Sequence, residues 1–284
     1  MTAAVLPASW PPLMLTVAPN GAFKTEADHP ALPLTPRTLA QTAKACLDVG
    51  ASMIHLHVRD VQGRHLLDAQ AYQEATAAIR QAVGQELVVQ ITSEAGKRYG
   101  PAEQMAVIRG VRPEAVSVAL RELMPDEASE KTSAPFFEWL GQERIMTQVI
   151  LYAPEELRRY RELCRRGVLP QAPRQLLFVL GRYSRDQQSD PQDLLPFLQA
   201  LDHEPAHWSV CAFGLKEAAC LMAAITFSGH ARTGFENNLF LPDGQRARDN
   251  AELVQLMASL SRRLNRPLAS AADVRAWFAQ RILS

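Results

Sequence analysis

Short apolar runs alternate with amphipathic helical segments along the whole chain, and this alternation constrains the fold more than any other feature. Each run is almost continuously apolar and rich in residues that favour strands. Such strands, separated by helices, predict a parallel sheet that is covered on both faces. The predicted strands cover residues 13–18, 52–58, 86–92, 114–120, 144–152, 174–181, 206–213 and 230–235.

The segments between the strands carry the signals of helix starts and ends. Thr35 precedes Pro36 at a first helical position, and Gly50 follows the last turn of the same segment. Eight βα units without a polar linker predict an α/β fold, a (β/α)8 TIM barrel formed as a single domain by residues 1–284. An open doubly wound sheet is the alternative. The predicted helices cover residues 34–51, 68–83, 153–167, 189–201, 215–226 and 247–265.

A final predicted helix, residues 271–283, is surplus to the eight units and is expected to cap the barrel or to join a subunit interface. The four cysteines are scattered and form no CxxC pair, so we expect them to be reduced and buried.

Charge and hydropathy exclude two classes of partner. Basic and acidic residues number 30 each, which gives no electrostatic reason to expect a nucleic-acid partner, and a small-molecule partner fits better. No run approaches the roughly 18 consecutive apolar residues of a membrane helix. The start of the chain lacks the basic and apolar regions of a secretory signal, so a cytoplasmic protein is expected.

The segment I-H-L-H-V-R-D places His55 and His57 two positions apart on a predicted strand. Period-two alternation turns both imidazoles to one face, where two neutral nitrogens can bind one divalent ion. Glu236 follows the eighth strand, and barrel closure places the second and eighth strands on either side of the first. Together the three side chains predict a site for zinc or another first-row divalent metal. The alternatives are a histidine pair hydrogen-bonded in the core and a glutamate that caps a helix or pairs with an arginine.

Other polar residues stand at the C-terminal ends of predicted strands, where a barrel carries its active site. Arg232 lies inside a short strand and requires an anionic partner, either a substrate carboxylate or a structural acid. His230, at the start of that strand, is expected to point to the opposite end of the barrel. The other candidates suit an oxygen-rich anionic substrate, although each can equally serve a turn: Asn20, Thr92, Ser93, Ser117 and Arg182.

Several segments resemble the β-keto acid cleavage enzyme family, in the same order along nearly the whole chain. They are T-V-A-P-N-G-A, G-A-S-M-I-H-L-H-V-R-D-V-Q-G-R, V-V-Q-I-T, F-V-L-G and G-H-A-R-T-G-F-E-N-N-L-F-L-P-D-G. The resemblance implies a zinc-dependent barrel, commonly a homotetramer, that condenses a β-keto acid with acetyl-CoA. The products are acetoacetate and the CoA thioester of the remaining acyl group. By the matching motifs, the metal ligands are His55, His57 and Glu236, the catalytic arginine is Arg232, and hydroxyls near the substrate are Thr92 and Ser117.

Such a reaction requires no covalent enzyme nucleophile. A divalent ion chelated by the keto oxygen and the carboxylate would stabilise the enolate that forms after proton loss. The carbanion would attack the thioester of acetyl-CoA, and a retro-Claisen step with the returning thiolate would end the cycle. Two alternatives are a metal-assisted aldolase or hydrolase that needs no CoA, and a non-catalytic barrel that binds a CoA thioester or keto acid.

Two departures from the family pattern bear on the chemistry. Asn237 stands where a well-known member has an aspartate, and an amide cannot act as a general base, so Arg232, a metal-bound water or Glu94 would have to do so. Phe23 stands where the aminohexanoate-cleaving enzyme has a glutamate that suits an ammonium group. We therefore predict poor use of the 5-amino substrate and a neutral or apolar acyl tail. The alternative is a dicarboxylic keto acid, because Arg182 could select an anionic tail.

Overall fold

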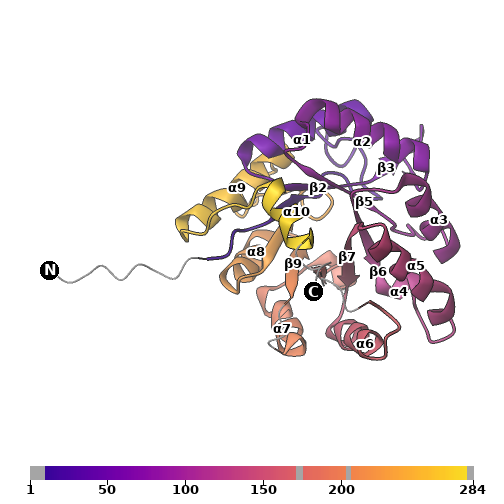
Figure 1. The fold of residues 1–284 in the computed structure, drawn as a ribbon. Coiled ribbons are helices and arrows are strands. Elements are labelled where there is room, and N and C mark those ends of the chain that lie inside the picture. The colour runs from indigo at the N-terminus through magenta and orange to yellow at the C-terminus, as the bar shows by residue number, and fades with distance from the viewer. Residues whose placement is uncertain (1–9, 171–174, 203–205, 280–284) are drawn as a thin grey trace.

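The computed structural model describes residues 10–170, 175–202 and 206–279 (Figure 1). Eight parallel strands form a closed barrel in the order β1-β10-β9-β8-β7-β6-β5-β2, and β1 pairs with both β10 and β2. Closure confirms the predicted TIM barrel and excludes the open sheet. The strands are β1 Leu15–Val17, β2 Met53–Leu56, β5 Val88–Thr92, β6 Ala115–Ala119, β7 Met146–Leu151, β8 Gln175–Leu180, β9 His207–Ala212 and β10 His230–Thr233.

Helices form a ring around the barrel (Figure 1). In α1, the Thr35 hydroxyl accepts a hydrogen bond from the Thr38 amide, and Gly50 ends the helix with a φ of 119°. The sequence pattern does not predict α3 or α5, because Gly110 in α3 and Pro135 in α5 weaken the helical signal. The helices are α1 Pro36–Val49, α2 Ala69–Val83, α3 Pro101–Val111, α4 Leu120–Leu123, α5 Glu130–Gln142, α6 Pro154–Arg165, α7 Leu195–Leu201, α8 Glu217–Thr226 and α9 Asn250–Arg263, with 3-10 turns at Arg185–Gln187 and Pro191–Leu194.

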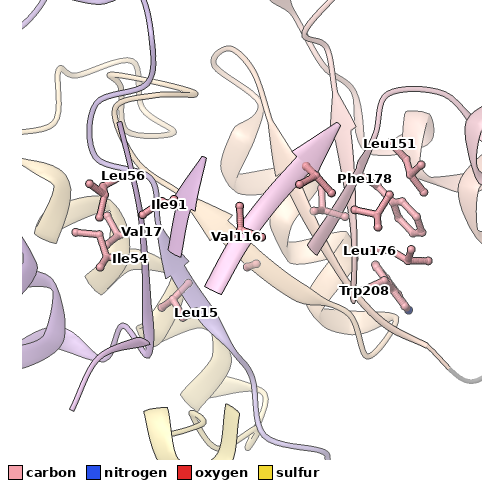
Figure 2. Packing of buried hydrophobic residues seen from close by; sticks show 14 of the residues in the cluster. Leu15, Val17, Ile54, Leu56, Ile91, Val116, Leu151, Leu176, Phe178 and Trp208 are labelled. Carbon is pink, nitrogen blue, oxygen red and sulfur yellow. The ribbon is translucent and has the colours of Figure 1, made fainter. Parts of the chain in front are cut away.

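Alternate residues of each strand face outward and pack under the helices (Figure 2). This outward set explains half of each apolar run in the sequence. The other half faces into the barrel, which is filled by side chains as in other barrels of eight strands. The labelled outward residues are Leu15, Val17, Ile54, Leu56, Ile91, Val116, Leu151, Leu176, Phe178 and Trp208.

Helix α10, Ala271–Ala279, closes the N-terminal end of the barrel, as Figure 1 shows. Its Val274 and Phe278 join a buried cluster with inward residues of the strands. The expected capping role is therefore confirmed, although residues 280–283 of the predicted helix lie outside the described residues. The strand residues of this cluster, with the residue that precedes β1, are Met14, Met53, Val88, Ala115 and Met146.

His230 lies at this capped end, as the sequence predicts. Its ring stacks on those of His207 and Trp277, with centroids 5.8 and 5.4 Å away, and its Nδ1 accepts the Met14 amide at 3.0 Å. It is therefore part of the barrel floor.

A layer of buried polar side chains lies above the floor. Gln90 donates to Gln148 at 3.5 Å across the interior. Toward the mouth, the side formed by β6 to β9 is apolar, with Ala119, Ile150, Leu177, Val179, Cys211 and Phe213 in one cluster. The mouth thus has a polar side around β1, β2, β5 and β10 and an apolar side opposite. The buried polar layer comprises Thr16, Gln90, Ser117, Gln148, Gln175 and Ser209.

The predicted strand 52–58 is wrong at its end, because β2 stops at Leu56. Two further strands, β3 Val58–Arg59 and β4 His65–Leu66, form a separate antiparallel hairpin. The physical reason is Asn20, whose Oδ1 accepts the His57 amide at 3.2 Å and whose Nδ2 donates to the His57 carbonyl at 2.8 Å. A side chain thus replaces the neighbouring strand as the partner of His57.

All four cysteines are buried and free of disulfides, as expected. Among the described residues, no helix has both the length and the apolar character needed to cross a membrane.

Phe278→Ala should lower the free energy of unfolding by about 3 kcal/mol, because it leaves a cavity between α10 and the barrel floor. Urea denaturation measures this change. Ala276→Ser, at an exposed position of the same helix, is the control and should cost less than about 0.5 kcal/mol. An equally small effect for Phe278→Ala would show that α10 does not contribute to the core.

Candidate functional site

Three potential metal ligands meet at the barrel mouth. His55 points inward from β2, His57 follows that strand, and Glu236 lies in the loop after β10. The two histidine Nε2 atoms are 3.2 Å apart, and Glu236 Oε2 lies 3.5 Å from each of them. One donor atom from each side chain falls within 4.8 Å of the others. The pairing of β1 with both β2 and β10 creates this convergence.

The protonation of this cluster suits a divalent cation. Gln90 Oε1 lies 2.8 Å from His55 Nδ1, so a proton on Nδ1 leaves the Nε2 lone pair facing the other two ligands. Burial and the Arg232 charge hold the pKa of His55 well below its usual value. Although burial opposes it, the Arg232 charge keeps the pKa of Glu236 well below the ordinary range. A neutral imidazole therefore faces an ionised carboxylate.

A buried atom without a hydrogen-bond partner also fits a cation site. Glu236 Oε2 is buried and accepts no hydrogen bond from the described residues. A buried carboxylate oxygen in this state is unfavourable unless a cation or a donor satisfies it. The residues present therefore fit a metal ion.

Arg232 supplies positive charge beside the three ligands. Its guanidinium forms an ion pair with Glu236 Oε1 and is buried, with 4% of the side chain exposed. Its Nε and Nη1 have no partner among the described residues. Arg232 lines the pocket above the ligands, together with Thr92, Glu94 and Arg182. These spare donors favour an anionic ligand in the pocket.

Glu94 brings a second carboxylate to the pocket. Its Oε2 lies 3.8 Å from His57 Nε2, and its Oε1 lies 3.5 Å from Arg182. Both distances exceed a normal hydrogen bond, so the carboxylate keeps open lone pairs. The Glu94 amide donates to Thr92 Oγ1 at 3.0 Å, which orients the Thr92 hydroxyl.

Glycines allow the loop that carries Glu236 to approach the segment after β1. Gly21 has a φ of 61°, and a Cβ there would lie 2.6 Å from the Glu236 side chain. Gly234 has a φ of 135°, and its Cβ would lie 2.4 Å from the Ala18 carbonyl oxygen. Side chains at either position would push the loop away from the two histidines.

The other sequence candidates lie around the site in different ways. The Ser93 hydroxyl donates to the Ser117 carbonyl at 3.2 Å, and the Ser117 hydroxyl is fully buried without a described partner. The Asn20 side chain holds the backbone of His57, as described above. Asn237 is 3% exposed and neither of its amide atoms has a described partner. Phe23 is half exposed at the outer rim.

Two neighbours of the site were not singled out from the sequence. Gln90 interrupts the apolar run 86–92, and a polar residue on an inner strand is a signal that could have identified it. Lys24 follows Phe23 in a loop, and no pattern distinguishes it. Its Nζ donates to the Glu236 carbonyl at 2.7 Å, and burial lowers its pKa.

Known proteins resemble this chain in sequence and in fold. The chain is 26% identical over 268 residues to a 3-keto-5-aminohexanoate cleavage enzyme of Acetoanaerobium sticklandii, covering 93% of this chain and 96% of that protein. It is 24% identical over 272 residues to a 3-oxoadipate:acetyl-CoA acetyltransferase of Cupriavidus necator, covering 93% and 94%. The structure of ObcA in complex with a C4-CoA adduct and oxalate matches with a TM-score of 0.72 at 16% identity, over 88% of this chain and 68% of ObcA, which shows a common fold.

The family comparison covers almost every described residue. The sequence model of the beta-keto acid cleavage enzyme family matches residues 12–279, from the segment before β1 to the end of α10. His55, His57 and Glu236 all lie within this match. The chain therefore belongs to the beta-keto acid cleavage enzyme family.

Proposed function

We propose that this chain is a zinc-dependent acyltransferase that condenses a β-keto acid with acetyl-CoA and releases acetoacetate and an acyl-CoA. The meeting of His55, His57 and Glu236 beside the spare donors of Arg232 carries the proposal. The acetyl-CoA dependence named for the Cupriavidus relative supports the choice of co-substrate.

His55, His57 and Glu236 would hold the metal ion. Two imidazole nitrogens and one carboxylate oxygen form a donor set that suits zinc and leaves positions open for substrate oxygens. When bound, the ion supplies Lewis-acid polarisation of the keto oxygen. Gln90 keeps His55 in the tautomer that presents Nε2.

Arg232 and Thr92 would bind and orient the substrate. The unpaired Nε and Nη1 of Arg232 can donate to a substrate carboxylate, and burial strengthens this interaction by excluding water. The Thr92 hydroxyl accepts a hydrogen bond from the Glu94 amide, and its own proton can be donated into the pocket.

Glu94 is the best candidate for the general base. Its Oε2 would accept the proton from the carbon between the keto and carboxyl groups, a transfer that a carboxylate performs and the Asn237 amide does not. A third carboxylate of the pocket, Glu122, is less available, because its Oε2 accepts hydrogen bonds from Ala95 N and Gln104 Nε2 at 3.0 and 2.7 Å.

A single domain over residues 1–284, a homotetramer and a cytoplasmic location remain predictions. Light scattering on the 31.4 kDa chain would establish the subunit number.

Purified protein should release acetoacetate from a panel of β-keto acids only when acetyl-CoA is present, and a chelator should abolish the release. Coupled detection of acetoacetate, with and without zinc added back, makes this measurement. Product without acetyl-CoA would favour the aldolase or hydrolase reaction. Ligand binding without any product would favour a non-catalytic barrel.

His57→Ala should reduce bound zinc at least tenfold and abolish activity, because the cluster loses one of three donors. Elemental analysis of the purified variant gives the metal content directly. His65→Asn is the matched control, since the His65 ring packs 5.2 Å from that of His57 but its Nε2 bonds the Glu94 carbonyl. Full metal content in His57→Ala would overturn the ligand assignment.

Glu94→Gln should lower kcat by about 100-fold or more, the usual contribution of a general base, while zinc content stays at the wild-type level. Steady-state kinetics and elemental analysis together separate proton transfer from metal loss. Asn237→Ala should change kcat far less. The reverse order of effects would remove Glu94 from the mechanism.

A further inference from the structure

A side hollow opens from the pocket above the metal ligands, and Lys24 and Arg182 both border it. The hollow and the pocket share four lining residues, so one ligand can occupy both. They are Glu94, Arg182, Phe213 and Glu236. We propose that this hollow binds a second carboxylate, and that the substrate of this chain is a dicarboxylic β-keto acid. The inference rests on the proposed function and specifies its substrate class.

The Arg182 guanidinium lies between two aromatic side chains and keeps N–H donors available for a ligand. Its guanidinium carbon lies 5.2 Å from the ring centroids of both Phe23 and Phe213. Such contacts fix the planar group and leave its N–H edge for an oxyanion. The nearest carboxylate oxygen, on Glu94, is 3.5 Å away, beyond the roughly 2.7–2.9 Å of a strong charge-assisted hydrogen bond.

The contact with Arg182 also changes the role expected for Phe23 in substrate selection. The sequence suggests that this ring selects an apolar tail, since it replaces a glutamate. In the structure the Phe23 ring supports a cation instead. The position therefore disfavours an ammonium group and favours an anionic group in the same hollow.

Lys24 adds a second cation with unused donors. Its ammonium donates one hydrogen bond, to the Glu236 carbonyl, and among the described residues no carboxylate forms an ion pair with it. Asp28 also borders the hollow, but its Oδ2 already accepts from the Thr25 amide and hydroxyl at 2.7 and 3.1 Å. Glu236 and Asp28 are near enough to act on its charge, but neither forms a direct ion pair with it, so the partly buried ammonium can still donate to an anionic ligand.

The position of Lys24 sets the length of that ligand. Lys24 contacts the backbone carbonyl of Glu236, while the carboxylate of the same residue faces His55 and His57. The length of one glutamate side chain therefore separates the Lys24 ammonium from the three ligands. A short carbon chain spans the same length. The apolar side of the main pocket, which includes Ile150, Leu177 and Val179, is a less favourable place for the second carboxylate.

A phosphate of acetyl-CoA is another source of negative charge. The hollow borders Glu236 directly, however, and the thioester must reach the reacting carbon near the same residue. The whole pantetheine arm lies between the thioester and the phosphates, so a phosphate in this hollow would leave the thioester far from the reaction. The geometry therefore favours a carboxylate of the keto acid.

The test compares 3-oxohexanedioate with 3-oxohexanoate, which differ only in the terminal carboxylate, in the wild-type protein and in Lys24→Gln and Arg182→Gln. The wild type should favour the dicarboxylate in kcat/KM by roughly tenfold or more, as a charged hydrogen bond of about 1.5–3 kcal/mol implies. Each variant should raise KM for the dicarboxylate about tenfold or more and change KM for 3-oxohexanoate and acetyl-CoA much less. Arg185→Gln, at a side chain that is 96% exposed, is the matched control and should behave as wild type.

Equal use of the two acids by the wild type would overturn the inference, and so would a rise in KM for acetyl-CoA alone, which would assign the cations to a phosphate. Calorimetric titration with hexanedioate and hexanoate tests the subsite without turnover. If no keto acid is cleaved, the proposed function fails. Binding of hexanedioate but not hexanoate, lost in Arg182→Gln, would still support the carboxylate subsite.

Discussion

The pairing of β1 with both β10 and β2 is the constraint on which the site depends. It closes the barrel and sets Arg232 beside Thr16 in register, so the loop after β10 reaches the end of β2. Glycines at positions 21 and 234 allow that loop to lie against the segment after β1. Without closure, Glu236 and the two histidines would belong to opposite edges of a sheet.

Closure also concentrates charge in a buried place. An arginine and a glutamate next to two histidines are unfavourable there unless each is satisfied. Arg232 and Glu236 satisfy each other in part, and burial keeps the His55 ring neutral. Three polar atoms of this pair have no hydrogen-bond partner among the described residues: one Glu236 carboxylate oxygen and two Arg232 guanidinium nitrogens. Both residues line the pocket. The polar side of the mouth therefore offers one acceptor suited to a cation and two donors suited to an anion.

The sequence predicts the barrel well, because outward and inward residues are both apolar along most strands and the helix caps are strong. It predicts the meeting of His55, His57 and Glu236 for the same reason, since closed topology fixes which strand ends are adjacent. The sequence does not predict α3 and α5, because a glycine in α3 and a proline in α5 weaken the helical pattern. The end of β2 is misplaced because it depends on the amide of Asn20, a contact distant in sequence. Lys24 and the aromatic contacts of Arg182 depend on loop conformation, which no periodic pattern encodes.

The two histidines and Glu236 lie far apart in the sequence, and this has a consequence for biosynthesis. A nascent chain that has left the ribosome as far as α8 carries both histidines but not Glu236, and its barrel still lacks β10. Two imidazoles alone hold a divalent ion weakly, so the proposed ion would not guide the folding of the segments made before β10. Loading of the proposed ion would therefore have to wait until β10 and the loop that carries Glu236 have been made and folded.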